Sequence, residues 1–186
     1  MEKDMPEIIN PTEAVKRVFT DLQIYDMKAL DTTDVHGLNF NIAHEASKTL
    51  EWKTARYHCD KHVVKMPLET TQMLCTVNWR YNQEAPYKPV HQKHPCTLWA
   101  GETVNNYRWL WKLGISLCKE YTFRYNRVHA CEKILAIVKD PPVELTNTGL
   151  TKFAQAMPDE YKNADVINAY HQYYNGEKKR LAVWKK

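Results

Sequence analysis

The sequence predicts a mainly α-helical protein that forms a single helical domain. Long stretches carry apolar residues at the three- and four-residue spacing of an amphipathic helix, whereas one short stretch alternates as a strand does. A chain of 186 residues has the usual size of one domain with its own core. We therefore expect a helical domain over residues 38–186, preceded by an N-terminal extension over residues 1–37 that packs on or near it.

The first predicted elements follow these patterns in chain order. Residues 11–22 begin with Pro and Thr and continue as a short amphipathic helix. Residues 38–42 alternate apolar with polar side chains and predict a small β element. Residues 45–77 are predicted to be helical, with Pro67 as the only interruption. Because proline lacks an N–H and crowds the preceding turn, we expect a kink or a new helix start there.

The second half of the chain is also predicted to be helical. Residues 78–94 contain several Asn and Pro residues and predict a long loop of the kind that often lines a site. A long helix is expected over about 96–125, since Pro95 suits a first helical position. A shorter helix over 131–138 ends at a Pro pair, and a last helix begins near Asp165.

The helix predicted over 96–125 has a core side and a solvent side. Glu120 and Arg124 are four residues apart and are expected to form an exposed ion pair. Its core side is predicted to carry Val104, Trp111, Cys118, Tyr121 and Tyr125.

The composition predicts a soluble protein with no membrane partner. Hydrophobic residues make up 44% and charged residues 26% of the chain, and no apolar run approaches a membrane span. The charged start lacks the apolar core of a secretory signal, so the protein is expected to stay where it is made. Five cysteines without a CxxC pair predict free, mainly buried thiols. The net charge of +4 permits a nucleotide or nucleic-acid partner without requiring one, and a homo-oligomer is also open.

Two imidazoles, an ammonium, a carboxylate and an amide recur at helical spacing on one face. Such groups titrate, donate and accept protons in catalysis, whereas a solvated face usually carries only Lys and Glu. The alternative is a solvated or hydrogen-bonded face with a chance run of His. This face, called the histidine stripe below, comprises His58, His62, Lys65, Glu69 and Gln72.

Asp60 and Lys61 lie beside the stripe, and Cys59 and Val63 are expected to point toward the core. A desolvated lysine can lose its proton and attack a sugar carbon or a carbonyl, so Lys61 is a candidate nucleophile or charge stabiliser. Asp60 or Glu69 would supply the acid or base. As an ordinary surface ion pair, Asp60 and Lys61 would contribute at most about 1 kcal/mol.

The four-residue spacing of His58 and His62 also suits two ligands of one zinc ion. His91, His94, Asp60 or Cys96 could complete such a site. The chain has neither the HExxH pattern nor the zinc deaminase pattern, so we expect no cofactor and leave a metal ion as a minority alternative.

The loop before residue 96 gathers cations and imidazoles where a helix begins. Free N–H groups at a helix N-terminus favour an anion such as phosphate, although a plain surface loop is the alternative. We expect this loop to meet the histidine stripe, so that one nucleotide bridges them. The predicted ligand-binding residues, including an aromatic ring that could stack on a base, are Gln72, Tyr87, Lys88, His91, Lys93, His94, Trp99 and Asn106.

These motifs resemble a family of short proteins encoded by tailed bacteriophages. The resemblance covers about residues 38–184 and implies a phage origin and a host-cytoplasmic setting, without implying catalytic roles. The chain departs from the family pattern by its extension over residues 1–37. The motifs are the HCDKHVVKM sequence of residues 58–66 with Glu69 and Gln72, then YKP at 87–89 with His91, HPC at 94–96 and Trp99, then FAQAMP at 153–158 and GEK at 176–178.

Taken together, the residues favour an enzyme that acts on nucleotides or nucleobases. It would cleave or transfer at an N-glycosidic bond, or modify a base. A non-catalytic protein that sequesters a nucleotide, such as a host immune signal, would use the same cations and aromatic rings without an aligned acid and nucleophile. A metal-dependent phosphoesterase is the third alternative.

Overall fold

The computed structural model of the chain describes residues 50–183, and this part is mainly helical, as predicted. The only β feature among these residues is a single bridge between Thr103 and Thr146. The helix predicted over 11–22, the strand over 38–42 and the extension over 1–37 lie outside the described residues. The helices are α3 (Leu50–Tyr57), α4 (Asp60–Arg80), α5 (Pro95–Ala100), α6 (Val104–Tyr125), α7 (Cys131–Ile137) and α8 (Val166–Tyr173), with a π-helix (Tyr174–Lys178) and a 3-10 helix (Lys179–Leu181) after α8.

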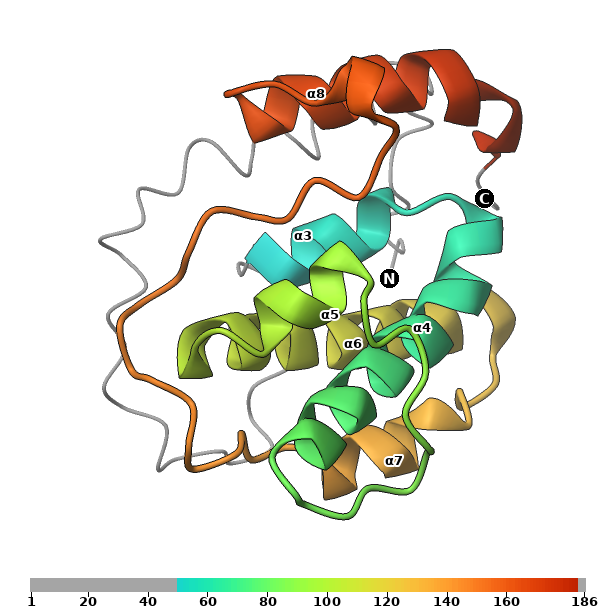
Figure 1. The fold of residues 1–186 in the computed structure, drawn as a ribbon. Coiled ribbons are helices and arrows are strands. Elements are labelled where there is room, and N and C mark those ends of the chain that lie inside the picture. The colour runs from blue at the N-terminus through green and yellow to red at the C-terminus, as the bar shows by residue number, and fades with distance from the viewer. Residues whose placement is uncertain (1–49, 184–186) are drawn as a thin grey trace.

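The core forms where α4 and α6 pack together, with α5 and α7 against them (Figure 1). Gly114 of α6 allows a close approach, since a Cβ there would lie 2.9 Å from Cγ2 of Thr70 on α4. A second cluster joins α3 to α6 through Ala55, Leu113 and Leu117. The main core includes Leu74, Val77, Tyr107, Leu110 and Leu135.

The helix predicted over 45–77 is broken, but not at Pro67. The break lies at His58 and Cys59, between α3 and α4, and α4 runs through Pro67, so the predicted new helix start is wrong. The break between α3 and α4 is stabilised by a contact with another helix. Arg124 donates to the carbonyl oxygens of Arg56 and His58 at 2.8 Å each, which satisfies the end of α3 with a side chain from α6.

The helix predicted over 96–125 is likewise two helices. α5 ends before Gly101, and Thr103 caps α6 by accepting a hydrogen bond from the N–H of Asn106 at 3.1 Å. The N–H of Val104 donates to the carbonyl of Thr146 at 2.9 Å, so the start of α6 is also fixed from outside the helix.

The core side predicted for this helix is only partly correct. Cys118 is buried, but Tyr121 and Tyr125 are partly exposed. Val104 and Trp111 pack against the main core, and the buried side of α6 also carries Leu110, Leu113 and Leu117 at helical spacing. The predicted ion pair of Glu120 and Arg124 forms, with Nε 2.7 Å from Oε1, but its predicted exposure is wrong, because each side chain is only 6% exposed.

Residues 138–165, called the strap below, connect the two ends of the molecule. The strap leaves α7, runs along the outside of the helices and reaches α8 on the opposite side (Figure 1). Thr103 holds it through a 2.9 Å hydrogen bond to the carbonyl of Gly149. At its far end, the hydroxyl of Tyr170 donates to the carbonyl of Ala154 at 2.8 Å, which fastens α8 to the strap.

The thiols follow the sequence prediction. All five cysteines are free, and four of them are buried while Cys96 is partly exposed. Cys59 and Val63 point inward, as expected. Within residues 50–183, none of the helices combines the length and the apolar character that a membrane crossing requires.

Candidate functional site

The histidine stripe begins at the start of α4. There it meets residues 166–183, called the C-terminal segment below, through the ring of Tyr174. His58 precedes the first residue of α4, yet its ring still meets that of His62 edge to face, with 6.1 Å between the centroids. Further along, Nζ of Lys65 lies 2.7 Å from Oε1 of Glu69. Gln72 follows one turn later and is partly buried. The structure therefore keeps the predicted stripe together across a helix break.

His58 is held in one tautomer. Its Nδ1 lies 2.7 Å from the carbonyl oxygen of Thr54, and a carbonyl can only accept, so Nδ1 carries the proton. Nε2 of the neutral ring is then left with a lone pair. Burial, partly offset by this hydrogen bond, lowers the pKa of His58 from 6.5 to about 4. At neutral pH His58 is therefore uncharged, and its Nε2 can accept a hydrogen bond.

His62 is also kept uncharged at neutral pH. Burial is the largest cause that lowers its pKa, followed by the charge of Lys178, while Glu69 raises it and Lys65 lowers it. Its ring meets Tyr174 edge to face, with 6.1 Å between the centroids. Cations from two separate elements therefore surround this imidazole.

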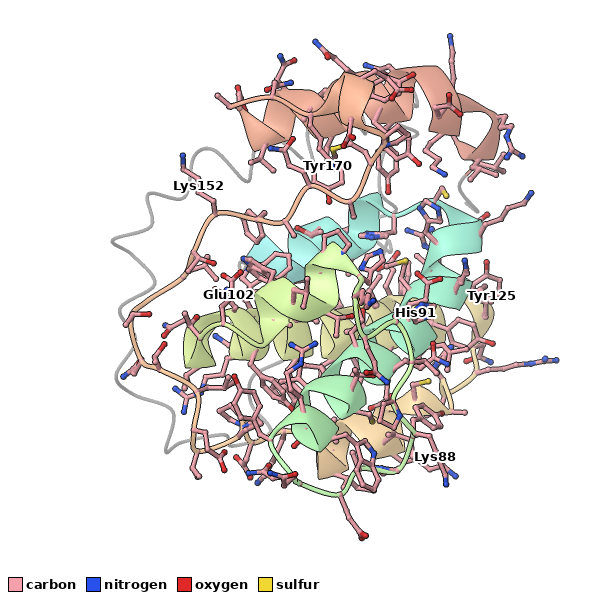
Figure 2. All side chains as sticks on the ribbon, viewed as in Figure 1. Lys88, His91, Glu102, Tyr125, Lys152 and Tyr170 are labelled. Carbon is pink, nitrogen blue, oxygen red and sulfur yellow. The ribbon has the colours of Figure 1, made fainter. Side chains whose placement is uncertain are left out.

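The C-terminal segment adds tyrosines that face α4 and α5. Burial raises the pKa of the Tyr174 hydroxyl, and Cys59 and Cys96 raise it further, so this ring lies within electrostatic reach of both thiols. Burial raises the pKa of Cys96 to about 11, against a hydrogen bond with the side chain of Tyr170. Tyr170 lies on the side of α8 that faces the other helices (Figure 2). Segments near residues 59, 96 and 174 thus meet at one place.

Glu69 is the charge that the parts of this site share. It raises the pKa of His62 on its own helix, and it also raises the pKa of His94 and of Cys96 at the start of α5. It contributes to the raised pKa of Tyr174 as well. The charge of Glu69 on the histidine stripe therefore acts on His94 and Cys96 at the end of the predicted binding loop.

The histidines of that loop have local structural contacts. His94 caps α5, because its Nδ1 accepts from the N–H of Cys96 at 3.2 Å. Burial lowers the pKa of His94, and His91 lowers it further. His91 adopts a positive φ of 53°, and its ring lies 6.3 Å from that of His94. Both rings are exposed and lie beside the stripe rather than within it.

The other loop residues point elsewhere. The hydroxyl of Tyr87 lies 3.8 Å from Sγ of Cys131 on α7, so this ring packs on the core. Lys88 is exposed at the end of the molecule that carries α7, away from Tyr170 (Figure 2). Lys93 is exposed too. Of the predicted phosphate grip, Lys88 therefore lies away from Tyr170, whereas His94 is close enough to Glu69 for that charge to raise its pKa.

Asn106 and Trp99 are enclosed by the protein. Asn106 is fully buried, and its amide group donates to the carbonyl of Trp99 at 2.8 Å and to the hydroxyl of Thr151 at 2.7 Å. Its carbonyl accepts from the N–H of Thr151 at 3.0 Å. Trp99 is 4% exposed and packs against Trp109 and Phe153. Both residues serve the fold, which corrects their prediction as ligand-binding residues.

Asp60 and Lys61 differ in their surroundings. Oδ1 of Asp60 accepts from Nη1 of Arg124 at 3.0 Å, and this ion pair is largely buried, so the carboxylate is directed to α6. That leaves Glu69 as the carboxylate of the stripe. Lys61 is exposed. Within residues 50–183, no three His, Cys, Asp or Glu side chains gather as a group that could hold a metal ion.

Sequence reasoning missed Tyr170, Tyr174 and Lys178 as parts of this site. These residues lie about a hundred positions after the stripe, and helical periodicity describes only neighbours along one helix. Tyr170 and Tyr174 are four residues apart, a spacing that is equally compatible with a core face of the last helix. A signal was present in the GEK motif of residues 176–178, which the phage resemblance already contained.

Comparisons with protein-family models, with curated proteins and with solved structures found no match for this chain. Its function is therefore inferred from the chemistry of its own side chains.

Proposed function

We propose that this protein is an enzyme directed at nucleotides or nucleobases, which cleaves or transfers at an N-glycosidic bond or modifies a base. The observation that carries this proposal is the pair of uncharged imidazoles, His58 and His62, in edge-to-face contact beside the carboxylate of Glu69. Neutral imidazoles can accept protons at physiological pH, and a nearby carboxylate can stabilise positive charge or activate water.

Hydrolysis of an N-glycosidic bond illustrates what the site must do. The C1′–N bond breaks and its electron pair leaves with the base, while a water oxygen bonds to C1′ and gives up a proton. Glu69 would take this proton, and His58 and His62 would carry protons toward the leaving base. Lys61 would stabilise charge that develops in the reaction. Tyr174, whose ring meets that of His62, and Tyr173, whose ring meets that of Tyr174, would offer aromatic contacts to a base.

The biological setting belongs to the same proposal. The HCDKHVVKM motif and the later YKP, HPC, FAQAMP and GEK motifs resemble short proteins of tailed bacteriophages. We propose a phage-encoded protein that works in the host cytoplasm on a nucleotide or a nucleic acid.

The test is a search for turnover with the full chain. Nucleoside mono-, di- and triphosphates, dinucleotides, single-stranded DNA and duplex DNA would each be incubated with the protein, and released bases or altered masses would be read by mass spectrometry. We expect His62→Gln to lower the turnover by about 100-fold or more, as for loss of a general acid or base. His129→Gln is the matched control, because the contacts of His129 are with the carbonyl of Val64 and the ring of Tyr121.

Thermal unfolding of both variants would check that each is folded. No product from any substrate would refute the enzyme proposal. A nucleotide that stays bound and unchanged would instead support the sequestering alternative.

A further inference from the structure

The segment that follows α8 is fixed along the first turn of α4 at two points. At one point the ring of Tyr174 meets that of His62. At the other, the carbonyl of Val183 accepts a hydrogen bond from the N–H of Asp60 at 2.9 Å. Lys178 lies between these two points in the chain, at the end of the π-helix Tyr174–Lys178. Its position beside the start of α4 therefore follows from contacts on both sides of it.

The ammonium of Lys178 is oriented by an aromatic ring. Its Nζ lies 5.1 Å from the centroid of Tyr173, in a cation–π contact. Tyr173 in turn meets Tyr174 edge to face, with 5.9 Å between the centroids. A path of rings thus connects Lys178 to His62. Lys178 is partly buried.

A second ammonium approaches His62 from α4 itself. Lys65 lies three residues after His62, which places both on one helical face. Its Nζ is bonded to Glu69, but an ammonium has three N–H donors and can hold the carboxylate and another anion together. The pair is also exposed on the lysine side, where an ion pair contributes little and exchanges easily.

We propose that Lys178, Lys65 and His62 form an anion subsite that binds the phosphate group of a nucleotide, and that the bound phosphate converts His62 to its protonated form. This inference rests on the proposed function and adds where the substrate phosphate lies. It moves the phosphate grip from the loop of residues 87–96 to the junction between α4 and the C-terminal segment.

The proton coupling follows from the charges that face His62. Without a ligand, burial, Lys178 and Lys65 all oppose its protonation, and only Glu69 favours it. A phosphate dianion placed among these groups offsets both ammonium charges and adds an acceptor for the imidazole N–H, so protonation becomes favourable. The groups that face His62 come from three elements. They are His58 between α3 and α4, Lys65 and Glu69 on α4, and Tyr174 and Lys178 in the C-terminal segment. Substrate binding would thus charge the general acid when it is needed.

The experiment is a titration of the full chain with inorganic phosphate, AMP and adenosine, followed by the histidine ring signals in NMR. We expect phosphate and AMP to bind with saturation and to raise the pKa of His62, and adenosine to leave that pKa unchanged. Phosphate affinity should increase as the pH falls through the titration of His62. If AMP binds while His62 keeps its ligand-free titration, or if adenosine produces the same shift, the proposal is overturned.

Variants locate the subsite. Lys178→Met and Lys65→Met should each weaken phosphate binding about tenfold, whereas Lys178→Arg should retain it because the charge is kept. Lys133→Met on α7, at the opposite end of the molecule from α8, is the matched control (Figure 1). An equal loss in Lys133→Met would mean general charge attraction and would overturn the subsite.

The outcomes separate this inference from the proposed function. Phosphate binding that depends on Lys178, in a protein without turnover, would support the subsite and refute the enzyme. Turnover that is unchanged in Lys178→Met and Lys65→Met would support the enzyme and refute the subsite.

Discussion

Arg124 on α6 bonds to Asp60 at the start of α4, with Nη1 3.0 Å from Oδ1. The same guanidinium donates to Glu120 at 2.7 Å and to the carbonyl oxygens of Arg56 and His58 at 2.8 Å each. One buried side chain therefore closes the end of α3, fixes the first turn of α4 and holds the backbone of His58. The position of the histidine stripe depends on this contact between helices.

Replacing this arginine should destabilise the whole fold. In Arg124→Met, two largely buried carboxylates lose their partner, and we expect a loss of about 3 kcal/mol in the free energy of unfolding. Lys119→Met on the same helix is the control, because Lys119 pairs with Glu132 at an exposed position and should cost less than about 1 kcal/mol. Urea unfolding measures both. Equal losses in the two variants would contradict a special role for Arg124.

Stability should fall in mild acid because of His58. Its pKa is about 4 in the folded chain and 6.5 ordinarily, so between these values the unfolded chain binds a proton that the folded chain does not. The free energy of unfolding is therefore unaffected by His58 above pH 6.5 and decreases as the pH falls toward 4. The total loss from this group is at most about 3 kcal/mol. His62 changes in the same direction.

Urea unfolding between about pH 7.5 and pH 4.5, a range that includes the ordinary pKa of histidine, would measure this loss. The decline should be shallower in His58→Gln and unchanged in His129→Gln. An identical decline in wild type and His58→Gln would show that His58 is not the group responsible.

Substitution by alanine should destabilise the fold much more at Asn106 than at the neighbouring Asn105. Asn106→Ala removes the bonds to Trp99 and Thr151 and should cost about 3 kcal/mol, with faster amide exchange at Thr151. The buried Oδ1 of Asn105 has no hydrogen-bond partner, so Asn105→Ala should change stability by less than about 1 kcal/mol. Hydrogen exchange and urea unfolding of both variants test this. A larger loss from Asn105→Ala would refute the argument.

Gly114 should not tolerate a methyl group, although alanine is the better helix former. A Cβ would lie 2.9 Å from Cγ2 of Thr70 and 3.2 Å from Leu135, and such crowding costs about 1–3 kcal/mol, more than the propensity gain of about 1 kcal/mol. Calorimetry should find a lower melting temperature in Gly114→Ala. Thr70→Ser removes the opposing methyl and should recover most of the loss in the double variant. No recovery would place the strain elsewhere.

Periodicity was sufficient to predict the helical class of this fold, because a helix that buries one face must repeat its apolar residues at that spacing. It failed at the ends of helices. The break at His58 depends on Arg124, 66 residues away in the chain. The start of α6 at Thr103 was encoded locally by a capping threonine, and Val104 adds a bond to the strap. Helix ends were set by partners that spacing along one helix does not describe.

The candidate site was half predictable for the same reason. His58, His62, Lys65 and Glu69 share one face, so their meeting follows from helix geometry. Tyr174 and Lys178 reach this face only through the path of the strap. Asn106 shows the converse error, since a polar residue near a proposed site was taken for a ligand when its hydrogen bonds complete the fold.

The last prediction distinguishes a lysine nucleophile from an acid–base route. Lys61 is exposed, and Lys65 forms an ion pair with Glu69. Neither lysine lies in an apolar pocket of the kind that removes the ammonium charge and makes the amine nucleophilic. We therefore expect Lys61→Arg and Lys65→Arg to keep turnover and ligand binding within about tenfold, because arginine retains the charge. Borohydride with substrate should trap no adduct on wild type. A collapse of turnover in Lys61→Arg, with an added mass on the wild-type peptide containing Lys61, would establish the lysine as nucleophile and limit His62 and Glu69 to proton transfer.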